Sequence, residues 1–133
     1  MENPQTTKRP CEPRSAAHHR VEITDDGITF LWPDLGSGDC HQTGGMLVCT
    51  PDGSATFSCT TWTTFSHFGD IWHTTIKVQD AAGNTLFDTQ TADSPRMTAT
   101  DPITTYNWNF TYPFDKSLSA RINGGTATQY YAC

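Results

Sequence analysis

The residues best able to do chemistry lie in one short stretch, 66–73, which reads Ser-His-Phe-Gly-Asp-Ile-Trp-His. Histidine accepts or donates a proton near neutral pH, and a neighbouring carboxylate can fix its tautomer and raise its pKa. We therefore name Asp70 and His73 as candidate acid/base residues, with His67 assisting. Strict alternation puts Asp70 and His73 on opposite faces, so the pair needs a turn near Gly69 to meet. The alternative is a structural turn with solvated histidines.

Other catalytic and metal-binding patterns are weak or absent in the sequence. Asp39, Cys40 and His41 carry metal-binding groups, but consecutive residues rarely reach one ion together. The cysteines show no C-x-x-C spacing, and the chain has neither a Gly-x-Ser-x-Gly elbow nor a phosphate-binding glycine motif. Glutamates occur only at positions 2, 12 and 22, which disfavours paired carboxylates for glycoside cleavage. We expect no metal and no cofactor.

Aromatic residues form the second candidate functional set. Trp62, Trp72, Trp108 and Tyr106 could line an apolar pocket or stack on sugar rings, or they could build the core. Alternation along the chain places Trp62 on the face opposite to Phe57. Either a bulge resets the register of this strand, or Trp62 lies on the outside of the protein.

Strands must position these side chains, because the clearest pattern in the chain has a period of two. Residues 106–114 read Tyr-Asn-Trp-Asn-Phe-Thr-Tyr-Pro-Phe, with a ring at every even position. Such alternating segments, separated by turn-forming residues, predict about eight strands. Residues 34–45 and 91–102 are predicted to be loops. The expected strands span 19–24, 28–32, 46–50, 55–65, 71–79, 85–89, 103–112 and 117–123, with a candidate short strand at 128–132. We predict an all-β, single-domain antiparallel barrel or sandwich with mostly meander connections.

Composition supports this fold class and argues against nucleic acid and membranes as partners. Threonine occurs 23 times, and threonine and aromatic residues suit a half-buried pleated surface. The net charge of −6 argues against nucleic acid as a partner, and no apolar run is long enough to cross a membrane. Residues 1–17 are expected to form a disordered or loosely attached arm before an all-β domain at 18–133. The N-terminus lacks a secretory signal, which predicts a cytoplasmic protein unless a mature secreted domain follows an added start methionine.

The five cysteines cannot all pair within one chain. Cys40 and Cys49 bracket a loop and could bridge, and Cys11 and Cys133 could meet near the termini. The cytoplasmic expectation favours small buried or terminal thiols instead. The pairing of these residues stays open at the level of sequence.

Three short stretches carry a family resemblance: Gly38-Asp39-Cys40, Asp70-Ile71-Trp72-His73 and Gly83-Asn84-Thr85-Leu86-Phe87. With them, residues 28–95 resemble a small bacterial all-β family that is known as a domain of unknown function. The resemblance implies no activity, so no functional residue follows from it.

Three functions agree with these features. The first is a β-barrel that binds a small, largely apolar molecule in an aromatic-lined pocket and could act as a cofactor-independent cyclase or isomerase. We place this hypothesis first, and the apparent lack of an export signal and of cofactor motifs agrees with it. The second is a non-enzymatic carbohydrate-binding module, and the third is a protein-interaction or inhibitor domain. A cavity reached past Asp70 and His73 favours the first, exposed Trp62 and Trp32 the second, and a filled core the third. The oligomeric state is left open.

Overall fold

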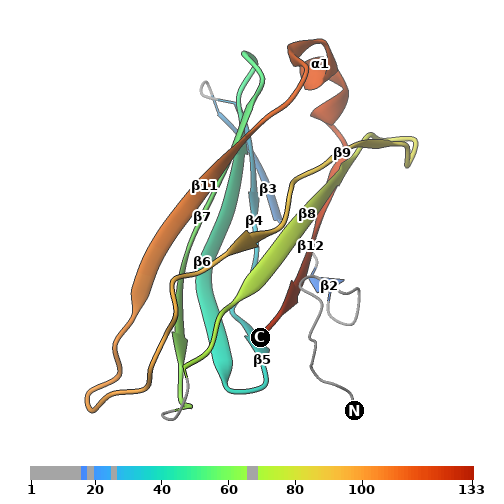
Figure 1. Cartoon of the computed structure of the whole chain (residues 1–133). Coiled ribbons are helices and arrows are strands. Elements are labelled where there is room, and N and C mark those ends of the chain that lie inside the picture. The colour runs from blue at the N-terminus through green and yellow to red at the C-terminus, as the bar shows by residue number, and fades with distance from the viewer. Residues whose placement is uncertain (1–15, 18–19, 25–26, 66–68) are drawn as a thin grey trace.

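Two antiparallel β-sheets make up the fold, so the all-β protein is a sandwich and not a closed barrel (Figure 1). The computed structural model describes residues 16–17, 20–24, 27–65 and 69–133. Within these residues, one sheet has six strands. They are β3 (Arg20–Thr24), β4 (Gly27–Leu31), β5 (Leu35–Ser37), β6 (Cys40–Cys49), β7 (Ser54–Thr63) and β11 (Tyr106–Pro113). Their order is β11-β7-β6-β4-β3, and β5 pairs with β6.

The second sheet has five strands in the described part of the chain. They are β2 (Ala16–Ala17), β8 (His73–Gln79), β9 (Thr85–Asp88), β10 (Ala92–Asp93) and β12 (Thr126–Ala132). Their order is β10-β8-β12-β2, with β9 beside β8. The first half of the chain follows the predicted meander from β3 to β7. The second half does not, because β8 starts the other sheet, β11 returns to pair with β7, and β12 ends beside β8.

The glycine-rich segment that we expected to be a loop at 34–45 is mostly strand. β5 and β6 form a hairpin around Gly38 and Asp39, and β6 runs from Cys40, six residues earlier than predicted. Glycine is rare in strand interiors, and for this reason the sequence pattern placed a loop here. The predicted loop at 91–102 likewise contains the short strand β10.

The prediction of a strand at 117–123 is wrong, because this segment is helical. A 3-10 helix (Lys116–Leu118) leads into α1 (Ser119–Ile122), and the Asp115 side chain caps it by accepting a hydrogen bond from the Ser117 amide at 3.0 Å. Leu118 and Ile122 are four residues apart, a spacing that fits one face of a helix as well as one face of a strand. No helix in the described residues is long and apolar enough to span a bilayer.

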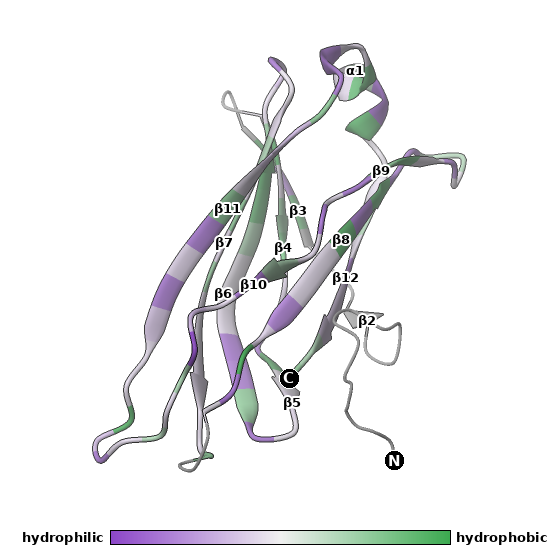
Figure 2. Cartoon of the chain, in the orientation of Figure 1, coloured by the Kyte–Doolittle hydropathy of each residue, from purple (hydrophilic) through white to green (hydrophobic). Residues whose placement is uncertain are grey.

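On β8 and β11, side chains alternate between the two faces of the sheet as predicted. On β8, Thr74, Ile76 and Val78 are buried, and the residues between them are half-buried. On β11 the rings are half-buried while the residues between them are exposed. Figure 2 shows the resulting bands of hydropathy along both strands. The largest fully buried apolar side chains are Phe30, Leu47, Phe57, Trp72, Ile76, Met97 and Ile122.

A pair of buried amides joins the two sheets. Gln42 on β6 and Gln129 on β12 are both fully buried. Each amide nitrogen donates to the other oxygen, at 3.2 Å from Gln42 and 2.7 Å from Gln129. Gln129 also donates to the Thr74 hydroxyl at 2.9 Å. Because buried amides without partners are costly, this pair holds the two sheets in one relative position.

A β-bulge makes room for this amide pair. The pairing of β6 with β7 shifts register between Thr43 and Met46, and Gly44 in the bulge has a positive φ of 66°. A side chain at Gly45 would come within 2.4 Å of the Gln42 amide nitrogen. The two glycines are therefore required by backbone conformation at one position and by space at the next.

A disulfide also joins the two sheets, and it differs from both pairings considered from sequence. Cys40 at the start of β6 bonds Cys133 after β12, across 93 residues. Cys49, which could have bridged Cys40, is a buried free thiol, as is Cys59. Cys11 lies outside the described residues. Strand pairing, which brings distant segments together, decides the partner of Cys40.

The buried amide pair predicts strong coupling between its two residues. Gln129→Leu or Gln42→Leu leaves one amide buried without its partner, which should lower the free energy of unfolding by about 2 kcal/mol. The double variant removes both polar groups and should lose clearly less than the sum of the single changes. Urea unfolding of the four proteins measures this. Additive losses would contradict a direct interaction between the amides.

The disulfide should contribute through the long loop that it closes. Replacing Cys40 and Cys133 by Ser should lower the free energy of unfolding by about 4.6 kcal/mol, the loop-entropy value for a closure of 93 residues. Reduced wild-type protein provides the control and should unfold at the same denaturant concentration as the double variant. A wild-type protein whose unfolding is unaffected by reductant would contradict this contribution.

Candidate functional site

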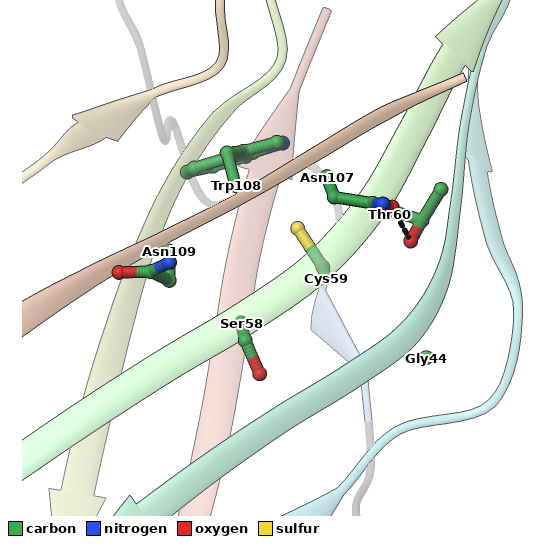
Figure 3. Close-up of a pocket in the computed structure, with 7 residues that line it drawn as sticks. All are labelled: Gly44, Ser58, Cys59, Thr60, Asn107, Trp108 and Asn109. Atoms are coloured by element: carbon green, nitrogen blue, oxygen red, sulfur yellow. Dashed lines mark hydrogen bonds between the residues drawn. The ribbon is translucent and has the colours of Figure 1, made fainter.

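A shallow depression of about 290 Å³ lies over the outer face of β6, β7 and β11. Its lining residues are Gly44, Ser58, Cys59, Thr60, Asn107, Trp108 and Asn109 (Figure 3). The side chains of Cys59 and Trp108 belong to the inner face, so the strands that carry them form the floor. The remaining lining residues point outward and carry no charge. The depression is therefore a neutral, polar surface site.

The polar side chains of the depression differ in how far they are already engaged. Thr60 donates to the Asn107 side-chain oxygen at 2.5 Å, which fixes that amide across the two strands (Figure 3). Among the described residues, Ser58 and Asn109 have no side-chain hydrogen bond. Asn109 is exposed and lies directly opposite Ser58 in the β-ladder. An amide offers both donors and acceptors, so this pair can bind hydroxyl groups.

Trp62 lies on the same outer face, two residues after Thr60 on β7. It is half-buried and stacks on His41 of β6, with ring centroids 5.3 Å apart and an angle of 17° between the planes. Burial alternates along β7 without a break, and Trp62 pairs in register with His41, so of the two alternatives left open by the sequence, the outside position is the observed one. Trp62 thus places an aromatic ring beside the polar depression.

Asp70, the first of the candidate acid/base residues, lies next to the interior of the sandwich. Its carboxylate accepts a hydrogen bond from the buried Thr63 hydroxyl at 2.7 Å. Its backbone forms an isolated bridge with Met97, with two hydrogen bonds of 2.8 Å. The preceding Gly69 has a φ of 82°, and a side chain there would contact Arg96 at 2.8 Å. Asp70 is thus held beside the interior.

His73 faces the other way, on the outer face of β8. Its Nδ1 lies 2.7 Å from the Asp93 carboxylate of β10, its partner in the β-ladder. The histidine therefore has a carboxylate partner, but this partner is Asp93 and not Asp70. The structure does not bring Asp70 and His73 together, and His67 lies outside the described residues.

The other aromatic candidates lie in or beside the core. Trp72 is fully buried and stacks on Tyr131 at 5.2 Å. Trp108 is half-buried and donates from its indole nitrogen to the Thr61 hydroxyl at 3.0 Å. Tyr106, also half-buried, accepts a hydrogen bond from the Thr98 amide at 3.3 Å. These rings contribute to packing. Trp32, whose exposure was expected to favour sugar binding, is buried and meets Phe57 edge-on at 6.0 Å, so of these two tryptophans Trp62 is the one on the outer face.

Potential metal ligands gather at a different place from the one considered from sequence. Cys40, Asp70 and Cys133 offer ligand atoms within 4.8 Å of one another. Asp39 and His41, the neighbours of Cys40, do not belong to this group. The two sulfur atoms are joined in the disulfide, which leaves the Asp70 carboxylate as the one available ligand of the three.

Burial makes the two free thiols poor nucleophiles. It raises the pKa of Cys59 to about 12 and that of Cys49 to the same value. Thiolate is the reactive form of cysteine, so both residues stay protonated near neutral pH. Cys59 lines the depression but does not supply nucleophilic catalysis to it.

Fold and site together define an all-β sandwich with a neutral polar depression on one outer face. The chain belongs to the family of unknown function DUF6294, which matches residues 46–133. This confirms the resemblance to a β family of unknown function, although the match begins after Gly38-Asp39-Cys40. No curated protein and no solved structure matches the chain significantly.

The raised thiol pKa values predict selective resistance to alkylation. In native protein near pH 8, iodoacetamide should leave Cys49 and Cys59 unmodified, because thiolate is scarce in both residues. In denaturant both should react fully. Peptide mapping by mass spectrometry assigns each site, and rapid native labelling of Cys59 would contradict its burial beneath the depression.

Proposed function

We propose that this protein is a non-catalytic carbohydrate-binding module that recognises a neutral glycan on the outer face of β6, β7 and β11. The observation that supports it most is the neutral polar depression beside the half-buried Trp62. Hydroxyl-rich ligands need groups that both donate and accept hydrogen bonds, and the free amide of Asn109 and hydroxyl of Ser58 do both. His41 covers one face of the Trp62 ring, so stacking on the C–H face of a pyranose would use the part of this half-buried ring that His41 leaves uncovered.

The absence of charge in the lining indicates the kind of sugar. Uronic acids and sulfated sugars are usually bound by Arg or Lys, which form charge-assisted hydrogen bonds with their anionic groups. The lining residues include neither. A neutral glycan matches this chemistry, since its hydroxyl groups can replace water around Asn107 and Asn109 without an unpaired charge.

The enclosed-pocket hypothesis has less support from the geometry. It needs Asp70 and His73 at the mouth of one cavity, but these residues have separate partners, Thr63 and Asp93. It also needs Trp72 as a pocket wall, but that ring is fully buried against Tyr131. General acid/base catalysis depends on such groups being held together, so a binding function agrees better with the structure.

The disulfide supports a site of action outside the reducing cytoplasm. Disulfides persist in oxidising compartments, whereas thiols are kept reduced in the cytosol. Cys40–Cys133 therefore favours an exported protein over the cytoplasmic location that we predicted from the N-terminus. Extracellular polysaccharides are encountered in such a compartment, which agrees with the proposed ligand.

The proposal predicts that Trp62 and Asn109 contribute to glycan binding. Isothermal titration of the full chain against a panel of soluble neutral polysaccharides should identify a ligand. Trp62→Ala and Asn109→Ala should each weaken its binding at least about tenfold, which corresponds to ~1.4 kcal/mol. Acidic polysaccharides should bind no better than the neutral ligand.

Tyr130→Ala provides a matched control. Tyr130 is a half-buried ring on the outer face of the other sheet, where it lies 6.0 Å from the Lys77 ammonium. This variant should keep wild-type affinity. Equal losses in Tyr130→Ala and Trp62→Ala, or no binding of wild-type protein to any neutral glycan, would contradict the proposal.

A further inference from the structure

We propose that two copies of this chain pair through β11, in an antiparallel arrangement that extends the six-stranded sheet across a two-fold axis. β11 lies at the end of its sheet and pairs only with β7 among the described residues. Figure 1 shows it along the outer margin of the sandwich. One edge of this eight-residue strand therefore presents backbone amides and carbonyls that can pair with another strand.

The two edges of the sheet differ in the features that normally prevent such pairing. Edge strands are protected by charged side chains, proline or bulges. β3, at one edge, includes Arg20 and Glu22 in its five residues. β11, at the other edge, has no charged residue, and its pairing with β7 is regular over the whole strand. Pro113 stands only at its last position.

The sequence of β11 is self-complementary, which argues for a second copy as the partner. A two-fold interface requires each residue to face an acceptable partner in the same strand of the other copy. With the axis at Asn109, this residue faces its own copy. The remaining pairs join ring to ring and polar group to polar group: Trp108 with Phe110, Asn107 with Thr111, and Tyr106 with Tyr112.

Length and burial favour this register over its neighbours. An axis at Asn109 pairs the seven residues from Tyr106 to Tyr112 and leaves Pro113, which lacks an amide hydrogen, outside. The rings of β11 are half-buried in the single chain. Pairing would bring a second row of rings beside them and remove more apolar surface from water. No like charges would meet at the interface.

The pairing has a consequence for the surface that carries the depression. In an antiparallel sheet the two-fold axis runs perpendicular to the sheet, so both depressions would lie on the same face. The two Asn109 side chains would face each other across the axis, and Asn107 of each copy would lie opposite Thr111 of the other. A long glycan could then contact both sites, and such bivalent contact raises the apparent affinity. The pairing itself does not depend on the proposed glycan binding.

The register predicts which charges restore or prevent association. Asn107→Lys/Thr111→Lys places like charges opposite each other twice, which should weaken the dimer at least about tenfold. Asn107→Asp/Thr111→Lys substitutes the same two exposed positions but places opposite charges there, and it should remain dimeric. Analytical ultracentrifugation of the full chain without glycan should give twice the chain mass for wild type and for the second variant.

Thermal unfolding followed by circular dichroism tests whether both variants are folded. Asn107→Asp/Thr111→Lys also controls for local disruption of β11, because it contains the same Thr111→Lys change. Monomeric wild-type protein at all concentrations would overturn the proposal. Equal association, or equal loss of association, in the two variants would overturn the register. Glycan titration is measured separately, so its failure would leave the dimer result intact.

Discussion

The contact between Gln42 and Gln129 is the constraint on which the arrangement of the two sheets depends. Apolar side chains pack in many relative positions at similar free energy, because hydrophobic burial has no direction. Two amides withdrawn from water must instead meet at hydrogen-bonding distance and orientation. One amide comes from each sheet, and Gln129 is fixed further by Thr74. The pair therefore selects one of the many packings that the apolar core would allow.

The same contact connects the interior of the sandwich to its outer surface. Gln42 needs space that a side chain at the next inward position would fill, and the glycine at Gly45 leaves that space free. The bulge that contains Gly45 also contains Gly44, which lines the outer depression. One bulge thus leaves space for the core amide on one side and lines the outer depression on the other. The depression and the packing around the buried amides therefore share two adjacent residues of β6.

Local sequence patterns predicted the strands, but they did not predict which residues of distant strands would contact the candidate site residues. The alternation along 71–79 and 106–112 placed the rings of β11 and the apolar residues of β8 on the correct faces, because side-chain direction depends only on neighbouring residues. It failed at Leu118 and Ile122, whose spacing suits a helix equally. The partners of His73 and Cys40 lie 20 and 93 residues away, and register between strands brings them together. No local pattern encodes that register.

The proposed glycan site rests on hydrogen-bonding groups that the fold leaves unused at the surface. The side chains of Asp70 and His73 have separate partners, Thr63 beside the interior and Asp93 on the outer face of β8. Of the polar side chains that line the depression, Ser58 and Asn109 form no hydrogen bond with any described residue, and they lie opposite each other on an uncharged surface. Water is the competitor of any ligand at such a surface, so hydroxyl groups that replace water one for one suit it best. Neutral sugars have this property along their whole length.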